Sequence, residues 1–433
     1  MKKVLIITYY WPPSGGAGVQ RWVKFAKYLR EFGWEPIIYT PLNPGFSITD
    51  QTLLRDVPEG ITVLKTPIWE PYEAYQRLMG KKTAPSITDH AAAKKSTTSL
   101  LHKLSVWVRG NLFIPDARKF WIKPSVKFLK KYLAENPVDA IVSTGPPHSM
   151  HLIALQLTRM QKIPWVADFR DPWTDIDYYK EMNISGFADR IHKKLELNTI
   201  TSCDALVVVG REMKANYEAL GATNVKLITN GFDPHDMDVV DLVMDSKFSI
   251  SHIGTLPPSF NMVHLWQVLA ELAMTDPEFK RNLEIKLVGK VQGAVLNDIK
   301  SYGLLDHLNA MGYVSHDAVP RIMKQSAVLA LIINRDSPNS TGILTGKIFE
   351  YMASGRPILA LGPVQGDLAK ILNETGTGTI AETNDHDEIK ANILNLYQKY
   401  CDKKLNSSPS AVTKYTRQNL TKELANVLNQ LVD

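Results

Sequence analysis

Short apolar runs alternate with amphipathic helical stretches twice along this chain of 433 residues. Each short run of Val, Ile, Leu and Ala predicts a buried strand, and apolar residues three and four apart predict a helix that covers it. Regular alternation of the two indicates a parallel sheet with helices on both faces. The sequence therefore predicts an α/β protein with two doubly wound, Rossmann-like domains, because one core rarely serves so long a chain.

The predicted elements fall into two series separated by a linker. The first series of strands covers 4–8, 36–39, 62–64, 140–143, 165–168, 205–209 and 225–228, and its main helices cover 19–32, 123–133, 148–160 and 190–202. The second series of strands covers 248–253, 284–288, 308–313, 327–332, 357–361 and 378–381. A turn at Thr229-Asn230-Gly231 precedes a linker near 232–247. We predict an N-terminal domain at 1–235, a C-terminal domain at 236–410 and a last amphipathic helix within 411–433.

The cysteines and the hydropathy of the sequence indicate the cellular compartment of the protein. The two cysteines, Cys203 and Cys401, are far apart and lack metal-like spacing, which indicates a reducing compartment and no metal site. No apolar run reaches the roughly 18 to 20 residues of a membrane-spanning helix. The apolar run after Lys2-Lys3 is too short for a secretory signal and favours a buried first strand. We expect a cytoplasmic protein.

Positive charge gathers in one segment of the first domain. Residues 77–131 hold thirteen Lys or Arg against two Asp, interleaved with Leu, Val, Trp and Phe. Such a segment is typical of a surface that contacts anionic lipid or a lipid-diphosphate at the inner face of a membrane. A solvated basic helix pair explains it equally well. Nucleic acid is not expected as a partner, since no nucleic-acid module is visible. The polar stretch at 87–99 is predicted to be a loop.

A glycine-rich turn follows the first strand. Gly15 and Gly16 precede the first helix, where glycine lets the backbone approach a ligand and a helix N-terminus favours an anion. The dinucleotide-binding fingerprint is incomplete, because Arg21 stands where its third glycine belongs. A purely structural tight turn is the alternative.

Two further segments end strands of the first domain. His148 begins a helix after a strand, where an imidazole could hydrogen-bond a substrate hydroxyl or phosphate. Arg170 and Asp171 follow the next strand and suit contacts to sugar hydroxyls and phosphate, and Trp173 could stack on a sugar face. The alternatives are a structural histidine and a structural Asp–Arg pair. The Asp-x-Asp pattern at 175–177 is interpreted as surface.

The most informative segment lies at 340–359. A loop with Gly342, Ile343, Leu344 and Thr345 leads into a helix that carries Lys347 in its first turn and Glu350 three residues later. Backbone N–H groups from Gly342 to Thr345 and the Lys347 ammonium would bind a diphosphate, while Glu350 could accept both ribose hydroxyls. An ordinary capped helix is the alternative.

With these motifs the sequence resembles the family 4 retaining glycosyltransferases of the GT-B fold. The resemblance covers nearly the whole chain and rests on the segments Gly15-Gly16, 230–233, 253–256, 287–289 and 347–359. It implies two domains that face a cleft, a last helix that crosses back to the first domain, and a metal-independent transfer that retains the anomeric configuration. It also implies that Gly15, Gly16, Gly254 and Thr255 approach the donor, and that Glu350 is the second glutamate of a Glu-x7-Glu element.

Two positions depart from the family pattern. Gly342 stands in place of the first glutamate, and Thr255 stands where relatives carry an arginine for the diphosphate. Lys347 is expected to supply that charge instead. The predicted catalytic residues are His148, Arg170, Asp171 and Lys347. The predicted donor-binding residues are Gly15, Gly16, Gly254, Thr255, Gly342, Ile343, Leu344, Thr345, Lys347 and Glu350.

The resemblance implies a UDP- or GDP-linked sugar as substrate, no separate cofactor and no bound metal. The acceptor would be a glycan, a lipid-linked molecule or another acceptor, in surface polysaccharide or glycoconjugate synthesis. Two other functions stay open from the sequence. One is a sugar-nucleotide epimerase of the same architecture, and the other is a non-catalytic sugar-nucleotide-binding subunit, which the missing glutamate at Gly342 allows.

Overall fold

The computed structural model describes residues 1–46, 49–71, 100–240, 242–334, 337, 339–405 and 411–433. It divides into two compact units: unit 1 comprises Met1–Thr229 with Arg417–Asp433, and unit 2 comprises Asn230–Thr416. The chain thus leaves unit 1 after Thr229 and re-enters it at Arg417, where the sequence predicts crossings after 235 and after 410. The predicted loop at 87–99 lies outside the described residues.

Unit 1 is built on a seven-stranded parallel sheet in the order β3-β2-β1-β4-β5-β6-β7. Its strands are β1 (Lys2–Ile7), β2 (Trp34–Pro41), β3 (Thr62–Thr66), β4 (Ala140–Gly145), β5 (Trp165–Phe169), β6 (Ala205–Val208) and β7 (Val225–Leu227). All seven strands predicted for this half are confirmed, each within two residues at either end.

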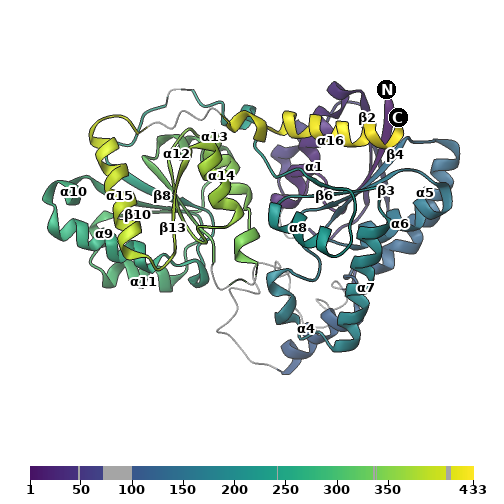
Figure 1. Cartoon of the computed structure of the whole chain (residues 1–433), viewed down its shortest axis with the longest axis horizontal. Helices are drawn as coiled ribbons and strands as arrows, with labels where there is room; N and C mark the ends of the chain where they lie inside the picture. Colours follow the sequence, from purple (N-terminus) through teal and green to yellow (C-terminus); the bar gives the residue numbers. More distant parts are fainter. Residues whose placement is uncertain (47–48, 72–99, 241, 335–336, 338, 406–410) are drawn as a thin grey trace. The chain divides into compact units, whose positions relative to one another are not determined.

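Helices cover both faces of this sheet (Figure 1). The α-helices are α1 (Ala17–Leu29), α4 (Leu100–Leu112), α5 (Lys119–Glu135), α6 (Ser149–Gln161), α7 (Gly186–Ser202), α8 (Arg211–Ala219) and α16 (Arg417–Val432), and the 3-10 helices are η1 (Arg30–Phe32), η2 (Gln51–Asp56) and η3 (Asp177–Met182). The residues of β1 alternate between the two faces. Val4 and Ile6 enter the cluster that contains α1 and α16, whereas Leu5 and Ile7 enter the cluster that contains α5 and α6. This alternation follows from the two-residue period of a strand.

The last helix, α16, packs beside α1 (Figure 1). Leu424 and Leu428 are buried in the same cluster as the α1 side chains. The Trp34 indole N–H donates to Asn429 Oδ1 at 3.1 Å. The C-terminal segment is therefore part of the core of unit 1, which is the return that the family resemblance implies for the last helix.

Unit 2 is built on a six-stranded parallel sheet in the order β10-β9-β8-β11-β12-β13. Its strands are β8 (Phe248–Ile253), β9 (Leu283–Val288), β10 (Leu308–Gly312), β11 (Val328–Ile332), β12 (Ile358–Leu361) and β13 (Gly378–Ala381). Its α-helices are α9 (Val263–Thr275), α10 (Pro277–Asn282), α11 (Gly293–Ser301), α12 (Val319–Gln325), α13 (Gly346–Ala353), α14 (Asp367–Thr375) and α15 (His386–Cys401). Its 3-10 helices are η4 (Pro234–Met237), η5 (Pro258–Phe260), η6 (Leu305–His307), η7 (His316–Ala318), η8 (Ser340–Gly342) and η9 (Val412–Tyr415). All six predicted strands are confirmed, each within one residue.

Both sheets reverse their strand order at one point. In unit 1 the reversal lies between β1 and β4, and in unit 2 it lies between β8 and β11. Ligands of doubly wound sheets bind outside the carboxyl ends of the strands at this switch point. The loops after β1 and β4 and those after β8 and β11 are therefore where a site is expected in each unit. None of the described helices is both long and apolar enough to cross a bilayer.

Candidate functional site

The start of α13 offers uncompensated positive polarity at the switch point of unit 2. Thr345 is the N-cap residue, but its side chain makes no capping hydrogen bond, and the first turn carries no acidic residue. Its Oγ1 is buried and has no hydrogen-bond partner in the described part of the chain. Since the first N–H groups of a helix lack partners within the helix, this end favours an anion.

The Lys347 side chain lies against the glycine that ends β8. Gly254 has φ +130°, and a Cβ there would overlap the Lys347 ammonium and stand 2.7 Å from its Cε. Glycine is thus required both by the backbone conformation and by the space that the lysine fills. The predicted residues Gly254 and Lys347 are therefore brought into contact.

The Lys347 ammonium makes no ion pair within 4 Å among the described residues. Burial lowers the pKa of Lys347, and the nearby Glu350 carboxylate opposes that shift only in part. A cation that is partly buried without a close counter-ion is costly, because burial removes part of its hydration. An anionic ligand at the start of α13 would supply the missing charge.

The end of β8 is held rigidly beside this cation. The Gly254 N–H donates to Val288 O at 2.7 Å, and the Ile253 N–H donates to Tyr351 Oη at 3.1 Å. Gly289 has φ +112°, and a Cβ there would stand 2.6 Å from Gly254 O. Thr255, the next residue, is exposed at this edge. The backbone that approaches Lys347 is thus fixed by its neighbours before any ligand binds.

The loop before α13 differs from its prediction in one respect. The N–H of Gly342 donates to Asn339 O at 2.9 Å, and that of Ile343 donates to Ser340 O at 3.4 Å. The side chains of Ile343 and Leu344 pack against the core of unit 2. These N–H groups close the η8 turn instead of pointing to an open site, and the prediction that Gly342 and Ile343 bind a diphosphate stays a prediction. Glu350 is half-buried on the next turn of α13.

Sequence reasoning overlooked a histidine on β8. His252 is 3% exposed, and its Nδ1 lies 3.2 Å from Ala330 O, so Nδ1 carries a proton. Its Nε2 is buried without a hydrogen-bond partner in the described residues. Burial and then the Lys347 charge lower the pKa of His252 to about 4, so this imidazole is neutral. The signal was a histidine in a buried strand two residues before Gly254.

In unit 1 the predicted ligand contact Arg170 has a structural task. Its Nη1 donates to Gly18 O at 2.7 Å, its Nε to Gly145 O at 3.3 Å, and its Nη2 to Pro146 O. Burial lowers the pKa of Arg170, and Asp171 opposes the shift. The guanidinium therefore joins the loops after β1 and β4, and its donors are engaged by backbone carbonyls. The alternative of a structural role fits this geometry.

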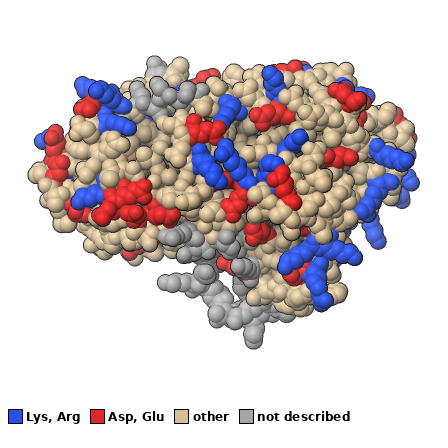
Figure 2. Space-filling model, viewed as in Figure 1, with Lys and Arg blue, Asp and Glu red and all other residues tan. Residues whose placement is uncertain are grey.

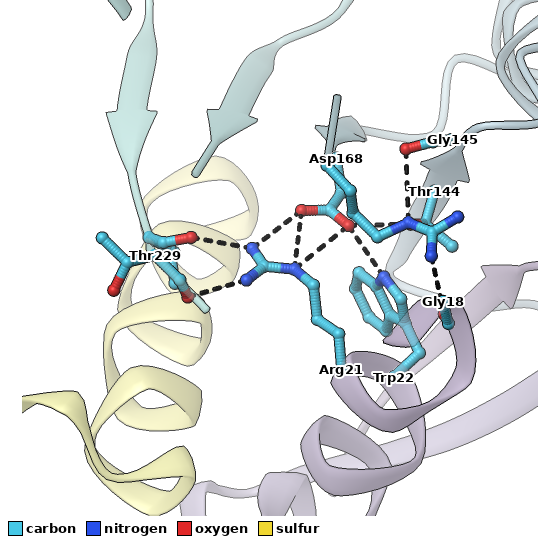
Figure 3. Close-up of polar contacts among 9 residues, drawn as sticks. Gly18, Arg21, Trp22, Thr144, Gly145, Asp168 and Thr229 are labelled. Carbon is cyan, nitrogen blue, oxygen red and sulfur yellow. Dashed lines mark hydrogen bonds and ion pairs between the residues drawn. The ribbon is translucent and has the colours of Figure 1, made fainter. Parts of the chain in front are cut away.

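Another arginine, Arg21, is buried and pairs with Asp168 (Figure 3). Arg21 Nη2 lies 2.9 Å from Asp168 Oδ1, and its guanidinium also donates to the carbonyls of Ile228 and Thr229 at 2.8 and 2.7 Å. Burial alone would raise the pKa of Asp168, but Arg21 and the hydroxyl of Thr144 lower it below its usual value. The pair fixes the residues at which the chain leaves unit 1. From the sequence, Arg21 was noted only because it stands where the dinucleotide-binding fingerprint has its third glycine.

His148 lies at the N-cap of α6 in a buried aromatic stack. It is 8% exposed, and its ring lies parallel to that of Trp173 at 4.4 Å between centroids. Burial, with His151 and Arg170 adding to it, lowers the pKa of His148 well below its usual value. The imidazole is therefore neutral near pH 7.

The predicted sugar-stacking role of Trp173 is wrong. The side chain is 3% exposed, and its indole N–H donates to His192 Nδ1 at 3.1 Å. One ring face is covered by His148, so no sugar can stack there. Asp171 is exposed beside this stack.

The glycine turn after β1 is open. Gly16 is the N-cap residue of α1 with φ +89°, and a Cβ there would meet no atom within 4 Å. The first turn of α1 carries no acidic residue and no side-chain cap. Gly15 and Gly16 thus leave the backbone accessible at the switch point of unit 1. Among the described residues, no cluster of three or more His, Cys, Asp or Glu is arranged to hold a metal ion.

Residues 247–399, which include Gly254, Lys347 and Glu350, match the family model described as glycosyl transferases group 1. No curated protein is significantly similar in sequence.

Several solved structures share the fold. One is Anabaena Alr3699/HepE in complex with UDP, at 15% identity and a TM-score of 0.61, with 100% of both chains covered. Another is sucrose-phosphate synthase from Thermosynechococcus elongatus, at 14% identity and a TM-score of 0.61, with 100% of this chain and 99% of that chain covered. WaaG, described as a glycosyltransferase involved in lipopolysaccharide biosynthesis, has 12% identity and a TM-score of 0.54, with 98% and 99% covered.

At these low sequence identities, the structural similarity establishes only the fold of this chain. The chain has two parallel-sheet α/β domains of the GT-B class, as predicted from the sequence. The match to the group 1 glycosyl transferase model is confined to residues 247–399, within the second unit. The prediction that the two domains face a common cleft stays a prediction.

Proposed function

We propose that the protein is a glycosyltransferase that moves a sugar from a nucleotide-sugar donor to an acceptor with retention of anomeric configuration. The observation that carries the proposal is the half-buried Lys347 ammonium, which lies against Gly254 at the uncapped start of α13. A diphosphate leaving group needs positive polarity at its oxygens as the glycosidic bond breaks. Lys347 and the first N–H groups of α13 provide it.

The donor is proposed to be UDP- or GDP-linked. Anabaena Alr3699/HepE is described in complex with UDP and with UDP-glucose, which supports a uridine nucleotide for a chain of this fold. In our proposal the diphosphate contacts Lys347, Thr345 and the backbone beside Gly254 and Thr255. Glu350, one turn further along α13, accepts the ribose hydroxyls. Because a cation is built into this site, we propose that the transfer is metal-independent and needs no separate cofactor.

The switch point of unit 1 is proposed to orient sugar and acceptor. His148 is neutral and offers a ring nitrogen as a hydrogen-bond donor, and Asp171 is exposed beside it. The open turn at Gly15 and Gly16 supplies backbone N–H groups. The acceptor would be a glycan or a lipid-linked molecule, in polysaccharide or glycoconjugate synthesis in the cytoplasm.

The test is a panel of nucleotides and nucleotide-sugars. Thermal unfolding is measured with UDP, GDP, ADP and their sugars, since a ligand of the folded state raises its stability. We expect one nucleotide class to raise the melting temperature and the matching nucleotide-sugar to be consumed with a suitable acceptor. NMR of the product should give the anomeric configuration of the donor. Absence of stabilisation by all three nucleotide classes, or an inverted product, contradicts the proposal.

A peripheral membrane contact is proposed for the described part of the predicted segment 77–131. Lys and Arg side chains gather over α5 (Figure 2), where Lys123, Lys127 and Lys131 are exposed. Phe120 on the same helix is 42% exposed, and the Lys119 ammonium lies 5.4 Å from its ring centroid. Anionic lipid attracts such a surface. We expect salt-sensitive binding to anionic vesicles that weakens in the double variant Lys127→Glu, Lys131→Glu; equal binding to neutral vesicles would contradict this contact.

A non-catalytic sugar-nucleotide-binding subunit is the second candidate. The observation that favours it is Gly342, at the position of the first glutamate of the family pattern. Binding of a nucleotide-sugar without turnover across a panel of acceptors would favour this function over the transferase.

A further inference from the structure

Two histidines at the start of α6 lie in the core of unit 1. His151 is 0% exposed and His148 is 8% exposed, and their ring centroids are 5.7 Å apart. His151 stacks on Phe169 at 4.4 Å between centroids, with the rings nearly parallel. Within the described residues, His151 Nε2 and His148 Nδ1 are both buried without a hydrogen-bond partner.

A chain of hydrogen bonds fixes the proton of His151. The Trp165 indole N–H donates to Ser143 Oγ at 2.8 Å, and Ser143 Oγ lies 2.8 Å from His151 Nδ1. If the Ser143 hydroxyl donates to Nδ1, only the Nε2–H of His151 lacks a partner. If Nδ1 donates to Ser143, both the Ser143 hydroxyl proton and the bare Nε2 lack one. Buried polar groups are satisfied wherever possible, so His151 carries its proton on Nε2.

The Nε2–H of His151 and Nδ1 of His148 border the same small space. A Cβ on Gly145 would stand 2.5 Å from His151 Nε2 and 3.1 Å from His148 Nδ1. Because Gly145 has no Cβ, both nitrogens border one small space and lie close enough for their partial charges to interact. Two N–H dipoles directed into that space would repel, whereas an N–H and a lone pair attract.

We propose that His151 is a positioning residue which, with Ser143, keeps the proton of His148 on Nε2. Nδ1 is the buried nitrogen of His148, so Nε2 is the nitrogen that water or a ligand reaches. The chain Trp165–Ser143–His151 thereby makes the accessible nitrogen of His148 a hydrogen-bond donor. What that donor serves, a sugar or acceptor hydroxyl, rests on the proposed function.

The alternative is a purely structural role, in which His151 only fills space in the core beside Phe169. In that case substitution of His151 or Ser143 would leave the tautomer of His148 unchanged. Burial lowers the pKa of His151 to about 3, so both rings are neutral near pH 7 and tautomers can be measured without interference from charge.

The experiment measures the tautomers directly on the full chain. Two-bond ¹⁵N–¹H correlation spectra of histidine-labelled protein at pH 7 distinguish Nε2–H from Nδ1–H. In the wild type we expect one Nε2–H tautomer at His148 and at His151. In His151→Phe, which keeps a flat ring against Phe169, and in Ser143→Ala, we expect His148 to lose that single tautomer. Ser125→Ala removes another buried hydroxyl that accepts a hydrogen bond in unit 1 and should leave His148 unchanged.

The outcomes separate this inference from the proposed function. An Nδ1–H tautomer at His148 in the wild type overturns the inference, and this arm needs no variant to fold. An unchanged His148 signal in both folded variants, His151→Phe and Ser143→Ala, also overturns the inference. Absence of sugar transfer contradicts the proposed function but leaves the tautomer measurement valid.

Discussion

Replacing Lys347 by methionine should have opposite effects on stability and on ligand binding. The folded pKa of Lys347 is lowered by burial, with Glu350 opposing the shift. A lysine whose pKa is lower in the folded than in the unfolded state destabilises the fold at pH values below both, and stability recovers as pH rises through the window between them. Methionine fills similar space without a charge. We therefore expect the ligand-free variant to be more stable than the wild type at pH 7.

The expected loss of affinity for a nucleoside diphosphate follows from the hydrogen bond that Lys347 would make and from the contacts that remain without it. A hydrogen bond to a charged group contributes about 1.5–3 kcal/mol. Its removal weakens binding of a nucleoside diphosphate about 10- to 150-fold, since about 1.4 kcal/mol corresponds to tenfold. The N–H groups at the start of α13 remain, so binding is weakened and not abolished. At a ligand concentration about 100 times the wild-type Kd, stabilisation of about 2.7 kcal/mol should fall to roughly 0.4 kcal/mol for a 100-fold weaker Kd.

Urea unfolding with and without the nucleotide found in the panel measures both effects. Lys300→Met is the matched control, because it removes an exposed lysine of unit 2 at the end of α11. It should change neither quantity appreciably. A Lys347→Met variant that binds as tightly as the wild type, or that is less stable without ligand, would refute the reasoning.

Three further substitutions test how unit 1 is held together. Arg170→Ala removes the charged donor from three carbonyls, and urea titration should give a loss of about 3 kcal/mol; a loss below about 1 kcal/mol would mean that these bonds contribute little. Asp168→Asn leaves Arg21 buried without its counter-ion and should cost about 3–5 kcal/mol. Burial raises the pKa of Asp168, but Arg21 and the hydrogen bonds from Thr144 and Trp22 together lower it below its usual value. The contribution of Asp168 to stability is therefore present above the unfolded pKa of about 4 and is lost as pH falls through the folded value. Thermal scans from pH 7 to pH 3 should therefore show a steeper loss in the wild type than in Asp168→Asn. Leu424→Ala, at 1% exposure on α16, should cost about 2–5 kcal/mol; near-neutral behaviour would mean that α16 contributes little to unit 1.

The strands were predictable because their signal is local. The run at 205–209 matches β6 within one residue, since a strand buried on both faces is continuously apolar. The runs at 248–253 and 378–381 coincide with β8 and β13, although both strands include polar residues. The residues at which helices begin were harder to predict than the strands. Helix α7 begins at Gly186 and not at 190, because Ser185 caps it by accepting a hydrogen bond from the Ala188 N–H at 3.3 Å. A single capping residue gives a weaker signal than a periodic stripe.

The site was predictable only where its residues follow strands. Gly254 and Lys347 were each predicted from their own segment, but their contact depends on β8 and α13 meeting at the switch point. The burial of Trp173 and the pairing of Arg21 with Asp168 join residues far apart in the chain, and no local spacing encodes them. Sequence patterns therefore located the loops, whereas the partner of each polar side chain followed from the packed structure.

The two units share a sheet architecture but differ in what they leave for a ligand. At the switch point of unit 1 the donors of Arg170 are directed at backbone carbonyls, and the imidazole of His148 is neutral. At the switch point of unit 2 the Lys347 ammonium has no ion pair within 4 Å in the described part of the chain. A charged oxygen gains most from a cation that is buried and uncompensated, while an uncharged hydroxyl needs only a directed donor. On this physical ground our proposal places the diphosphate of a nucleotide-sugar at unit 2 and neutral sugar or acceptor hydroxyls at unit 1.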